Sequence, residues 1–326
     1  MTFLKSREAI LLGALVVLLI LIASRFPSFI LPSNLVAVFT DTTPLLILAL
    51  GQMAVILTRC IDLSVAANLA LTGMVCAMIN VAAPGLPIGF VLVVALSLGA
   101  VLGAINGLFV WKLGIPSIVV TLGTMTIFRG MVFVISEGQW INAHEMTAAF
   151  TGWPRHIILG VPVMAWIGLA AFAIMAVVMN STTLGRSFFA VGGNPHAAVY
   201  TGLNVGRTQF YAFVLSGMLA GLCGYLWVAR YAVAYVDIAG GFELDVVAAC
   251  VIGGLSIAGG AGTVFGTVLG ALFLGVVKNA LPVVNISPFW QLAISGAAII
   301  IAVFFNARAG KAQQGRVILK SAERTQ

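Results

Sequence analysis

Polar and ionisable side chains interrupt long apolar runs of this sequence. If those runs cross a bilayer, a charged side chain at the centre costs about 2.5–3.5 kcal/mol on insertion scales, so it needs a partner or water. Donor and acceptor groups of this kind can line a path for a polar solute. We therefore predict a substrate pathway lined by Asp41, Thr42, Gln52, Asn68, Asn106 and Arg129. The alternative for each is a hydrogen bond between helices.

The proline at position 44 lies directly after Asp41, Thr42 and Thr43. Proline lacks the N–H donor that a helix interior needs, so it can break the helix at this point. Irregular backbone at membrane depth is tolerated where it lines a cavity. The segment is therefore a candidate position for the pathway.

The sequence holds no familiar catalytic or nucleotide-binding pattern. It lacks the G-x-x-x-x-G-K-[ST] loop, the G-x-S-x-G elbow and the H-E-x-x-H zinc motif. Its four cysteines form no C-x-x-C pair and its three histidines have no ligand spacing, so the cysteines are interpreted as small buried side chains. We expect no catalytic residue, no metal and no cofactor bound by this chain, which is interpreted as not being an enzyme.

The largest polar loop, about residues 180–207, contains the signals of a short helix. Asn194 suits the N-cap, Pro195 suits the first helical position, and Gly202 can end the helix. We predict a capped, partly apolar surface helix over 195–201. Such a helix suits the docking of a partner protein; the alternative is an ordinary connector.

The elements that would hold these residues are long apolar segments. Of the 326 residues, 61% are hydrophobic and 8% are charged, against about 25% charged in a typical soluble domain. A membrane span needs about 20 mostly apolar residues. We predict an all-α polytopic membrane protein with about ten transmembrane helices, over 9–24, 35–57, 63–82, 87–111, 117–135, 157–179, 208–229, 244–258, 262–281 and 288–306. The glycine-rich region 244–281 is alternatively a broken or re-entrant element.

The basic residues indicate the orientation of these spans. With the N-terminus in the cytoplasm, most Lys and Arg fall on the inner side, Arg59 among them, and Arg25, Arg155 and Arg230 fall outside. We predict two cytoplasmic termini, a single transmembrane domain over 1–306 and a basic cytoplasmic tail over 307–326. The net charge of +7 then marks cytoplasmic segments and not a surface for nucleic acid.

Two pairs of segments resemble each other weakly. Residues 61–67 resemble 243–249, and 99–104 resemble 266–271. The pairs run in opposite directions in the predicted topology, so an inverted repeat is possible; chance similarity of small, apolar helices is the alternative. Glycines also recur at four-residue spacing, which favours close packing of helices: Gly99, Gly103 and Gly107, Gly217 and Gly221, and Gly262, Gly266 and Gly270.

Several motifs occur together in a recognisable order. They are 192–198 ending at Gly202, Ile61-Asp62-Leu63-Ser64-Val65, 115–124 with Arg129-Gly130, and 242–245 with 251–254 and 259–262. Over about residues 35–306 the chain resembles the permease subunits of bacterial ABC sugar importers of the ribose, arabinose, rhamnose and autoinducer-2 type. The resemblance implies that the predicted surface helix couples to an ATPase, through Gly193, Asn194, Pro195, His196, Ala197, Ala198, Tyr200, Thr201 and Gly202.

The resemblance also implies an assembly in the bacterial inner membrane. A second permease copy or paralogue pairs with this chain in the lipid, ABC ATPase subunits carry ATP and Mg, and a periplasmic sugar-binding protein delivers the solute. The run 138–141 looks closer to the rhamnose and autoinducer-2 branches, and the run 234–238 looks most like rhamnose-type permeases, so rhamnose is the first expectation. Autoinducer-2, ribose or another monosaccharide are the alternatives, and a branched-chain amino acid is the runner-up substrate class. Thr58-Arg59-Cys60 stands where ribose-type sequences tend to carry Ser-Gly.

Two other classes of protein remain as alternatives. A secondary transporter driven by an ion gradient would work without an ATPase and would need an ion-relay pair of acids, for which Asp41 alone is thin support. An intramembrane enzyme would need a catalytic set, and the sequence names none.

Overall fold

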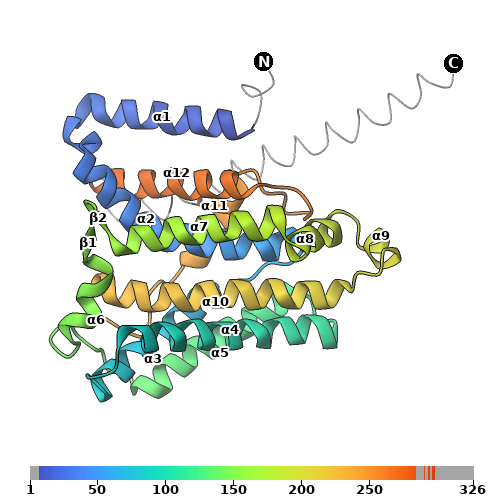
Figure 1. The fold of residues 1–326 in the computed structure, drawn as a ribbon, viewed down its shortest axis with the longest axis horizontal. Helices are drawn as coiled ribbons and strands as arrows, with labels where there is room; N and C mark the ends of the chain where they lie inside the picture. Colours follow the sequence, from blue (N-terminus) through green and yellow to red (C-terminus); the bar gives the residue numbers. More distant parts are fainter. Residues whose placement is uncertain (1–6, 284–289, 291–292, 294–295, 298–326) are drawn as a thin grey trace.

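The computed structural model describes residues 7–283, 290, 293, 296 and 297. Its long helices lie side by side in one bundle (Figure 1). Eight of the described helices are long and apolar enough to cross a bilayer: α1 Arg7–Arg25, α2 Pro32–Leu57, α3 Val65–Ala82, α4 Ile88–Leu113, α5 Ser117–Ser136, α7 Val163–Ser181, α10 Val205–Tyr231 and α12 Val264–Val283. The predicted all-α polytopic fold is confirmed. The predicted tail 307–326 and most of the predicted span 288–306 lie outside the described residues.

Short elements occupy the two ends of the bundle. One end carries η2 (Pro27–Ile30), α6 (Ala148–Gly152), η3 (Trp153–Arg155) and the antiparallel hairpin of β1 (Ile157–Ile158) and β2 (Val161–Pro162). We call it the hairpin end. The opposite end carries α8 (Thr183–Gly193) and α9 (Pro195–Tyr200), and we call it the α9 end (Figure 1). The predicted span 157–179 is therefore wrong at its start, because Gly160, with φ of 77°, turns the chain into the hairpin.

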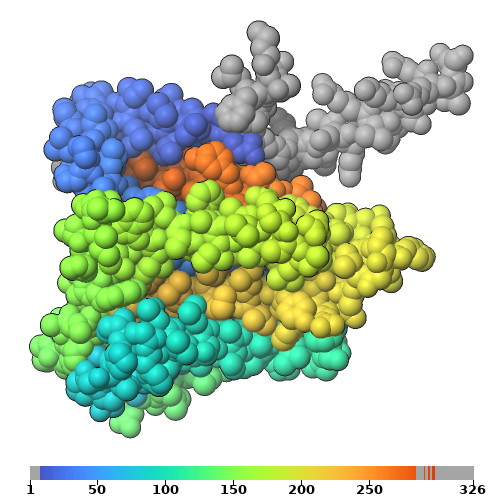
Figure 2. Space-filling view, in the orientation of Figure 1, coloured from blue at the N-terminus to red at the C-terminus, as the bar shows by residue number. Residues whose placement is uncertain are grey.

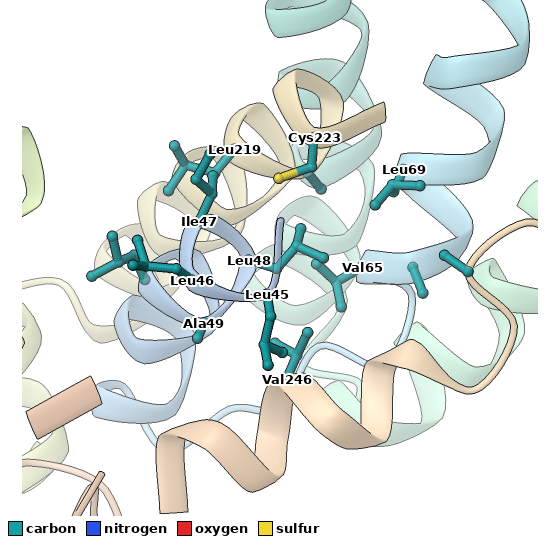
Figure 3. Packing of buried hydrophobic residues seen from close by; sticks show 14 of the residues in the cluster. Leu45, Leu46, Ile47, Leu48, Ala49, Val65, Leu69, Leu219, Cys223 and Val246 are labelled. Atoms are coloured by element: carbon teal, nitrogen blue, oxygen red, sulfur yellow. The ribbon is translucent and has the colours of Figure 1, made fainter. Parts of the chain in front are cut away.

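Helix α2 forms the centre of the bundle. Every residue from Thr42 to Leu57 is buried, as expected for a helix that is apolar on all sides. Figure 3 shows the segment 45–49 of α2 packed against Leu219 and Cys223 of α10 and Val246 of α11 (Phe242–Ile252). A residue in this stretch of α2 therefore contacts several helices at once.

The expectation that Pro44 breaks its helix is wrong. α2 runs without interruption from Pro32 to Leu57 with Pro44 inside it. The hydroxyls of Thr40, Thr42 and Thr43 donate to carbonyls four residues earlier, at 2.7, 2.7 and 3.0 Å. Neighbouring hydroxyls of this kind help a buried helix to accommodate a proline.

Of the two spans predicted within 244–281, the second is confirmed by α12, but the first is wrong, and the alternative of a broken element describes it. α11 has only 11 residues, so it is about 16 Å long, too short for a hydrocarbon core of about 30 Å. The loop 253–263 continues from it to the α9 end, where the Gly260 N–H donates to the carbonyl of Leu57. Non-helical backbone is tolerated here because it packs against protein.

The predicted glycine faces of α4 and α10 are confirmed as helix contacts, whereas Gly262 lies in the loop before α12 and not on a helix. A Cβ on Gly217 of α10 would lie 2.7 Å from the Cα of Gly103 in α4, and one on Gly221 would lie 2.9 Å from the Cα of Gly99. The two helices therefore touch at the backbone and run antiparallel. On the other side of the bundle, Gly270 of α12 meets Gly253 at the end of α11 in the same way.

These contacts also fix the directions of the two helix pairs that resemble each other in sequence. Gly73 of α3 lies against Gly224 and Asn68 against Gly217, so α3 runs parallel to α10. Thr42 of α2 lies against Gly275, and Gly260, just before α12, donates to Leu57 at the end of α2, so α12 runs antiparallel to α2. Arg230 pairs with Asp41 and Gln209 donates to Thr58, so α10 is also antiparallel to α2 and therefore parallel to α12. The pairs α3–α4 and α11–α12 therefore run in opposite senses, as an inverted repeat requires, although α3 has 18 residues and α11 has 11.

Candidate functional site

A cavity of about 200 Å³ lies between α2, α10, α11 and α12. It lies toward the hairpin end, because Tyr231 is the last residue of α10 and Phe242 the first of α11. The predicted pathway residues Asp41 and Thr42 are both in its wall. The other lining residues come from distant parts of the chain: Leu45, Trp227, Tyr231, Phe242, Gly275, Lys278 and Asn279.

Two charged groups in the cavity wall are paired with groups beside it. The Nη2 and Nε atoms of Arg230 donate to the same oxygen of Asp41, at 2.8 and 3.2 Å. The Nζ atom of Lys278 donates to a carboxylate oxygen of Asp245 in α11. Each ionised side chain is thereby neutralised by an opposite charge, which lowers the cost of holding it inside the bundle.

Aromatic rings form another part of the wall. The ring of Trp227 lies 5.1 Å from that of Phe242 and 5.2 Å from that of Tyr231, centroid to centroid. The Nζ atom of Lys278 lies 5.3 Å from the centroid of Phe242. The cavity thus combines an apolar aromatic side with a small set of hydrogen-bonding groups, which is the usual composition of a small-molecule site.

The amides predicted to line the pathway lie elsewhere, and inter-helix hydrogen bonding describes them. Asn68 donates to the carbonyl of Gly99 at 3.2 Å, and Asn106 links Ser64 to Thr124 with two bonds of 2.7 Å. Gln52 is fully buried, and its amide pairs with the main-chain N–H and C=O of Asp62 at 3.1 and 3.2 Å. These bonds hold the start of α3 between α2 and α4.

Arg129 lines a second, wider depression of about 490 Å³ between α5 and the segment 236–243. It donates to the carbonyl of Ile238 at 2.6 Å and lies 3.9 Å from the carboxylate of Asp237. The Asp237 side chain is 85% exposed, so this contact is open to solvent. The structure therefore places Arg129 apart from the cavity that holds Asp41.

The Asp41–Arg230 pair gives a measurable prediction. Asp41→Ala should lower the free energy of unfolding by about 1–3 kcal/mol, because Arg230 then keeps its charge without a partner. In the double variant with Arg230→Ala, the two losses should be less than additive, with an interaction energy of about 0.5–3 kcal/mol. Thermal unfolding in detergent is measured for the four proteins of this double-mutant cycle: the wild type, the two single variants and the double variant. Additive losses would show that the pair contributes nothing.

The second predicted site, the surface helix, is present at the α9 end. α9 spans Pro195–Tyr200, and the side chain of Asn194 accepts a hydrogen bond of 3.0 Å from the N–H of Ala197. Gly202, with φ of 84°, follows it. Ala198 faces the bundle while Tyr200 is 92% exposed. Gly193, Asn194, His196, Ala197 and Thr201 are also exposed, so the helix presents most of the predicted coupling residues on the surface (Figure 2).

Helix α8 is an element that the sequence interpretation missed. It begins at Thr183, where the hydroxyl of Thr182 accepts from the N–H of Gly185 at 3.1 Å, and it packs its apolar side on α2, α7 and α10. Thr182-x-x-Gly185 ahead of Phe188 and Val191 is a local helix-start signal. α8 connects the membrane-spanning bundle to α9.

A comparison with known protein families identifies the family of the chain. Residues 34–303 match the family described as "Branched-chain amino acid transport system / permease component". The chain belongs to this permease family. The resemblance that the motifs indicated is therefore confirmed at the level of the family, and the chain is a multi-pass membrane transport component.

Curated relatives of this permease align over most of their length. "Ribose import permease protein RbsC" of Escherichia coli K12 is 37% identical over 301 residues, which cover 90% of this chain and 91% of the relative. The protein of the same name from Haemophilus influenzae is 36% identical over 297 residues, covering 89% and 90%. "Autoinducer 2 import system permease protein LsrC" of Klebsiella pneumoniae is 35% identical over 313 residues, covering 94% and 88%. No solved structure matches the chain.

Proposed function

We propose that this permease is the membrane-spanning subunit of an ATP-driven importer in a bacterial inner membrane, and that its cargo is a monosaccharide. Its family and the printed names of its relatives, import permeases for ribose and autoinducer 2, support the transporter class. The observation that carries the substrate class is the cavity of Asp41, Thr42, Trp227, Tyr231, Phe242, Lys278 and Asn279. The chain itself binds no nucleotide in this proposal.

The cavity suits a small polyhydroxylated ring. Its volume of about 200 Å³ lies below the roughly 300–1,000 Å³ of sites for drug-sized ligands. A sugar ring has an apolar C–H face, which can lie on the indole of Trp227, and hydroxyls at its rim, which can reach Asp41 and Asn279. Both hydrogen-bond donors and acceptors are needed for hydroxyls, and the polar wall offers both.

The ion pairs favour a neutral cargo over a branched-chain amino acid, which the family description names. An amino acid carries an ammonium and a carboxylate, and each would need an unpaired charge of opposite sign. Asp41 and Lys278, the charged residues that the structure places in this wall, are already paired with Arg230 and Asp245. Breaking either pair to bind cargo would leave a charge without its partner.

Rhamnose is our first candidate among monosaccharides, on the runs 138–141 and 234–238. The relatives' names support ribose and autoinducer 2 as the next candidates. The two runs meet in space, since Ile141 and Ala234 exchange main-chain hydrogen bonds of 2.9 Å and Trp140 stacks on Tyr235 at 4.9 Å. They lie at the hairpin end, where a solute would enter if that end faces the periplasm.

The positions of the two sites support the proposed assembly. α9 lies at the end of the bundle opposite to the hairpin, so an ATPase docked on α9 and a sugar-binding protein docked at the hairpin end would not compete. A second permease copy or paralogue completes the membrane part. In this arrangement both termini are cytoplasmic, and ATP and Mg are held by the partner ATPase.

The experiment that tests the substrate class is a binding assay on the purified permease. L-rhamnose, D-ribose, autoinducer 2 and L-leucine are titrated in parallel by calorimetry. We expect binding of at least one of the first three, and we expect Trp227→Ala to weaken it roughly tenfold or more, because the stacking surface is lost. Trp166→Ala is the matched control, since this indole lies on α7 away from the cavity and is 39% exposed. Binding of leucine alone would contradict the proposal.

A further inference from the structure

Three stretches of backbone meet at the α9 end. They are the end of α2 at 57–59, the end of α8 at Gly192-Gly193, and the loop 253–263 at Gly259-Gly260. The Gly260 N–H donates to the Leu57 carbonyl at 3.0 Å. A Cβ on Gly260 would lie 2.5 Å from the Cα of Gly193, and one on Gly192 would collide with the Leu57 oxygen and the Gly260 nitrogen. The contact therefore requires glycine on both sides.

Arg59 joins two of these stretches directly. Its Nε donates to the carbonyl of Gly192 at 2.7 Å, and its Nη2 donates to the carbonyl of Gly193 at 3.0 Å. These are the last carbonyls of α8, which have no partner within the helix and carry the negative end of its dipole. The guanidinium therefore caps α8 one residue before Asn194, the cap of α9.

Arg59 makes these bonds from an unfavourable backbone conformation. Its φ is 64°, a region that glycine adopts freely and that residues with a Cβ avoid. Such a residue persists only where its surroundings hold it in place, and it is a reason to look for a function. Glycine would suit this backbone better, but it has no side chain to reach the carbonyls of α8.

The loop that contacts this cap leads to the cavity. Loop 253–263 continues α11. The first residue of α11, Phe242, lines the cavity, and its Asp245 pairs with Lys278 of the cavity wall. One continuous stretch of chain thus runs from the backbone contact at Gly260 to the cavity. Its non-helical half is less stiff than a helix, so it can change shape without unfolding a membrane span.

We propose that Arg59 is a positioning residue. Its guanidinium holds the end of α8, and with it α9, against the end of α2, where loop 253–263 packs through Gly259 and Gly260; we call this link the tie. When a partner displaces α9, the tie moves the end of α8 and the loop together, and the loop moves α11 at the cavity. The proposal rests on the proposed function in one respect, that an ATPase docks on α9. The side chain of Arg59 acts through position and touches no substrate.

The test compares Arg59→Gly, Arg59→Lys and a charge control, Lys112→Ala, which removes an exposed cation at the end of α4. Arg59→Gly removes the tie but also relieves the backbone, which offsets part of the lost hydrogen bonding, so the protein should still fold. Arg59→Lys keeps the charge but lacks the planar guanidinium that bonds two carbonyls at once, so it should restore exchange and transport only in part. Hydrogen exchange of the permease alone should be roughly tenfold faster at the Gly260 amide in Arg59→Gly, because a capped end that loosens exposes its hydrogen bonds.

The second readout is transport by the complex with its ATPase and binding protein in proteoliposomes. We expect Arg59→Gly to lower the maximal uptake rate roughly tenfold at unchanged KM, a fold-change that corresponds to the loss of a coupling of ordinary size. ATP hydrolysed per solute should rise, and Lys112→Ala should match the wild type. If Arg59→Gly leaves hydrogen exchange at Gly260 unchanged, Arg59 does not hold the loop in place. If exchange becomes faster but uptake equals that of the wild type, the contact plays no part in coupling. If the wild-type complex shows no ATP-driven uptake, the proposed function fails, while the exchange result still decides the tie.

Discussion

Gly217→Val should prevent the bundle from forming. A Cβ at this position would overlap the carbonyl of Gly99 and lie 2.7 Å from the Cα of Gly103. The atoms in the way are backbone atoms of α4, so no side chain can rotate to relieve the clash. α10 also packs on α2 and α3, so α4 and α10 cannot separate without opening the core. Overpacking commonly costs about 1–3 kcal/mol, and we expect this site at or above that range.

The matched control is Gly123→Val in α5. Gly123 lies within a membrane-length helix like Gly217, but a Cβ there meets nothing within 4 Å. The helix propensity of the two substitutions is the same, so any difference measures the α4–α10 contact. We expect Gly123→Val to give a monodisperse peak in size-exclusion chromatography and a near-wild-type Tm, and Gly217→Val to give aggregate. Equal behaviour of the two variants would contradict the packing described here.

Tyr200→Ala should abolish ATP-driven transport while leaving the permease folded. The side chain is 92% exposed at the tip of α9 and contributes little to the bundle. An exposed tyrosine on a capped helix is a suitable anchor for a partner, and such anchors are typically worth 2 kcal/mol or more. We therefore expect docking of the ATPase to weaken by roughly 30-fold or more. Co-purification and surface plasmon resonance with the ATPase measure this directly.

The control for Tyr200→Ala is Leu159→Ala at the hairpin end. Leu159 is 87% exposed, so both variants remove a large exposed side chain, but from opposite ends of the bundle. ATPase affinity should be unchanged in Leu159→Ala. Wild-type affinity and uptake in Tyr200→Ala would show that α9 is an ordinary connector.

The sequence was sufficient for features that depend on short-range chemistry. Asn194, Pro195 and Gly202 predicted α9 because capping and helix termination are decided within a few residues. The glycine faces of α4 and α10 predicted close packing because four-residue spacing puts glycines on one side of a helix. The apolar segments predicted the eight membrane-length helices because the length and composition of a span can be read directly from the chain.

Features that depend on three-dimensional neighbours were harder to predict. Pro44 was expected to break α2, but the threonines before it and the helices around it keep α2 continuous. An amide within a span can face a pathway or bond to a neighbouring helix, and the sequence does not distinguish the two. The packing of the bundle directs the amides to neighbouring chain segments, as seen for Gln52, Asn68 and Asn106.

The aromatic wall of the cavity had no signal in the sequence. Trp227, Tyr231 and Phe242 stand near the ends of apolar segments, where aromatic residues are common at membrane interfaces. Nothing in their spacing sets them in one wall with Asp41, because position 41 lies far earlier in the chain than positions 227, 231 and 242. Arg59 is similar, because only the fold brings it to the carbonyls of Gly192 and Gly193.

The most direct test of the central claim is uptake by a reconstituted system. The permease is placed in proteoliposomes with its ATPase and binding protein, and uptake of labelled rhamnose, ribose and autoinducer 2 is measured with ATP, without ATP, and with an ion gradient alone. We predict that one of these solutes accumulates only with ATP, and that Tyr200→Ala removes this accumulation. Accumulation driven by an ion gradient without the ATPase would contradict the account and make the protein a secondary transporter.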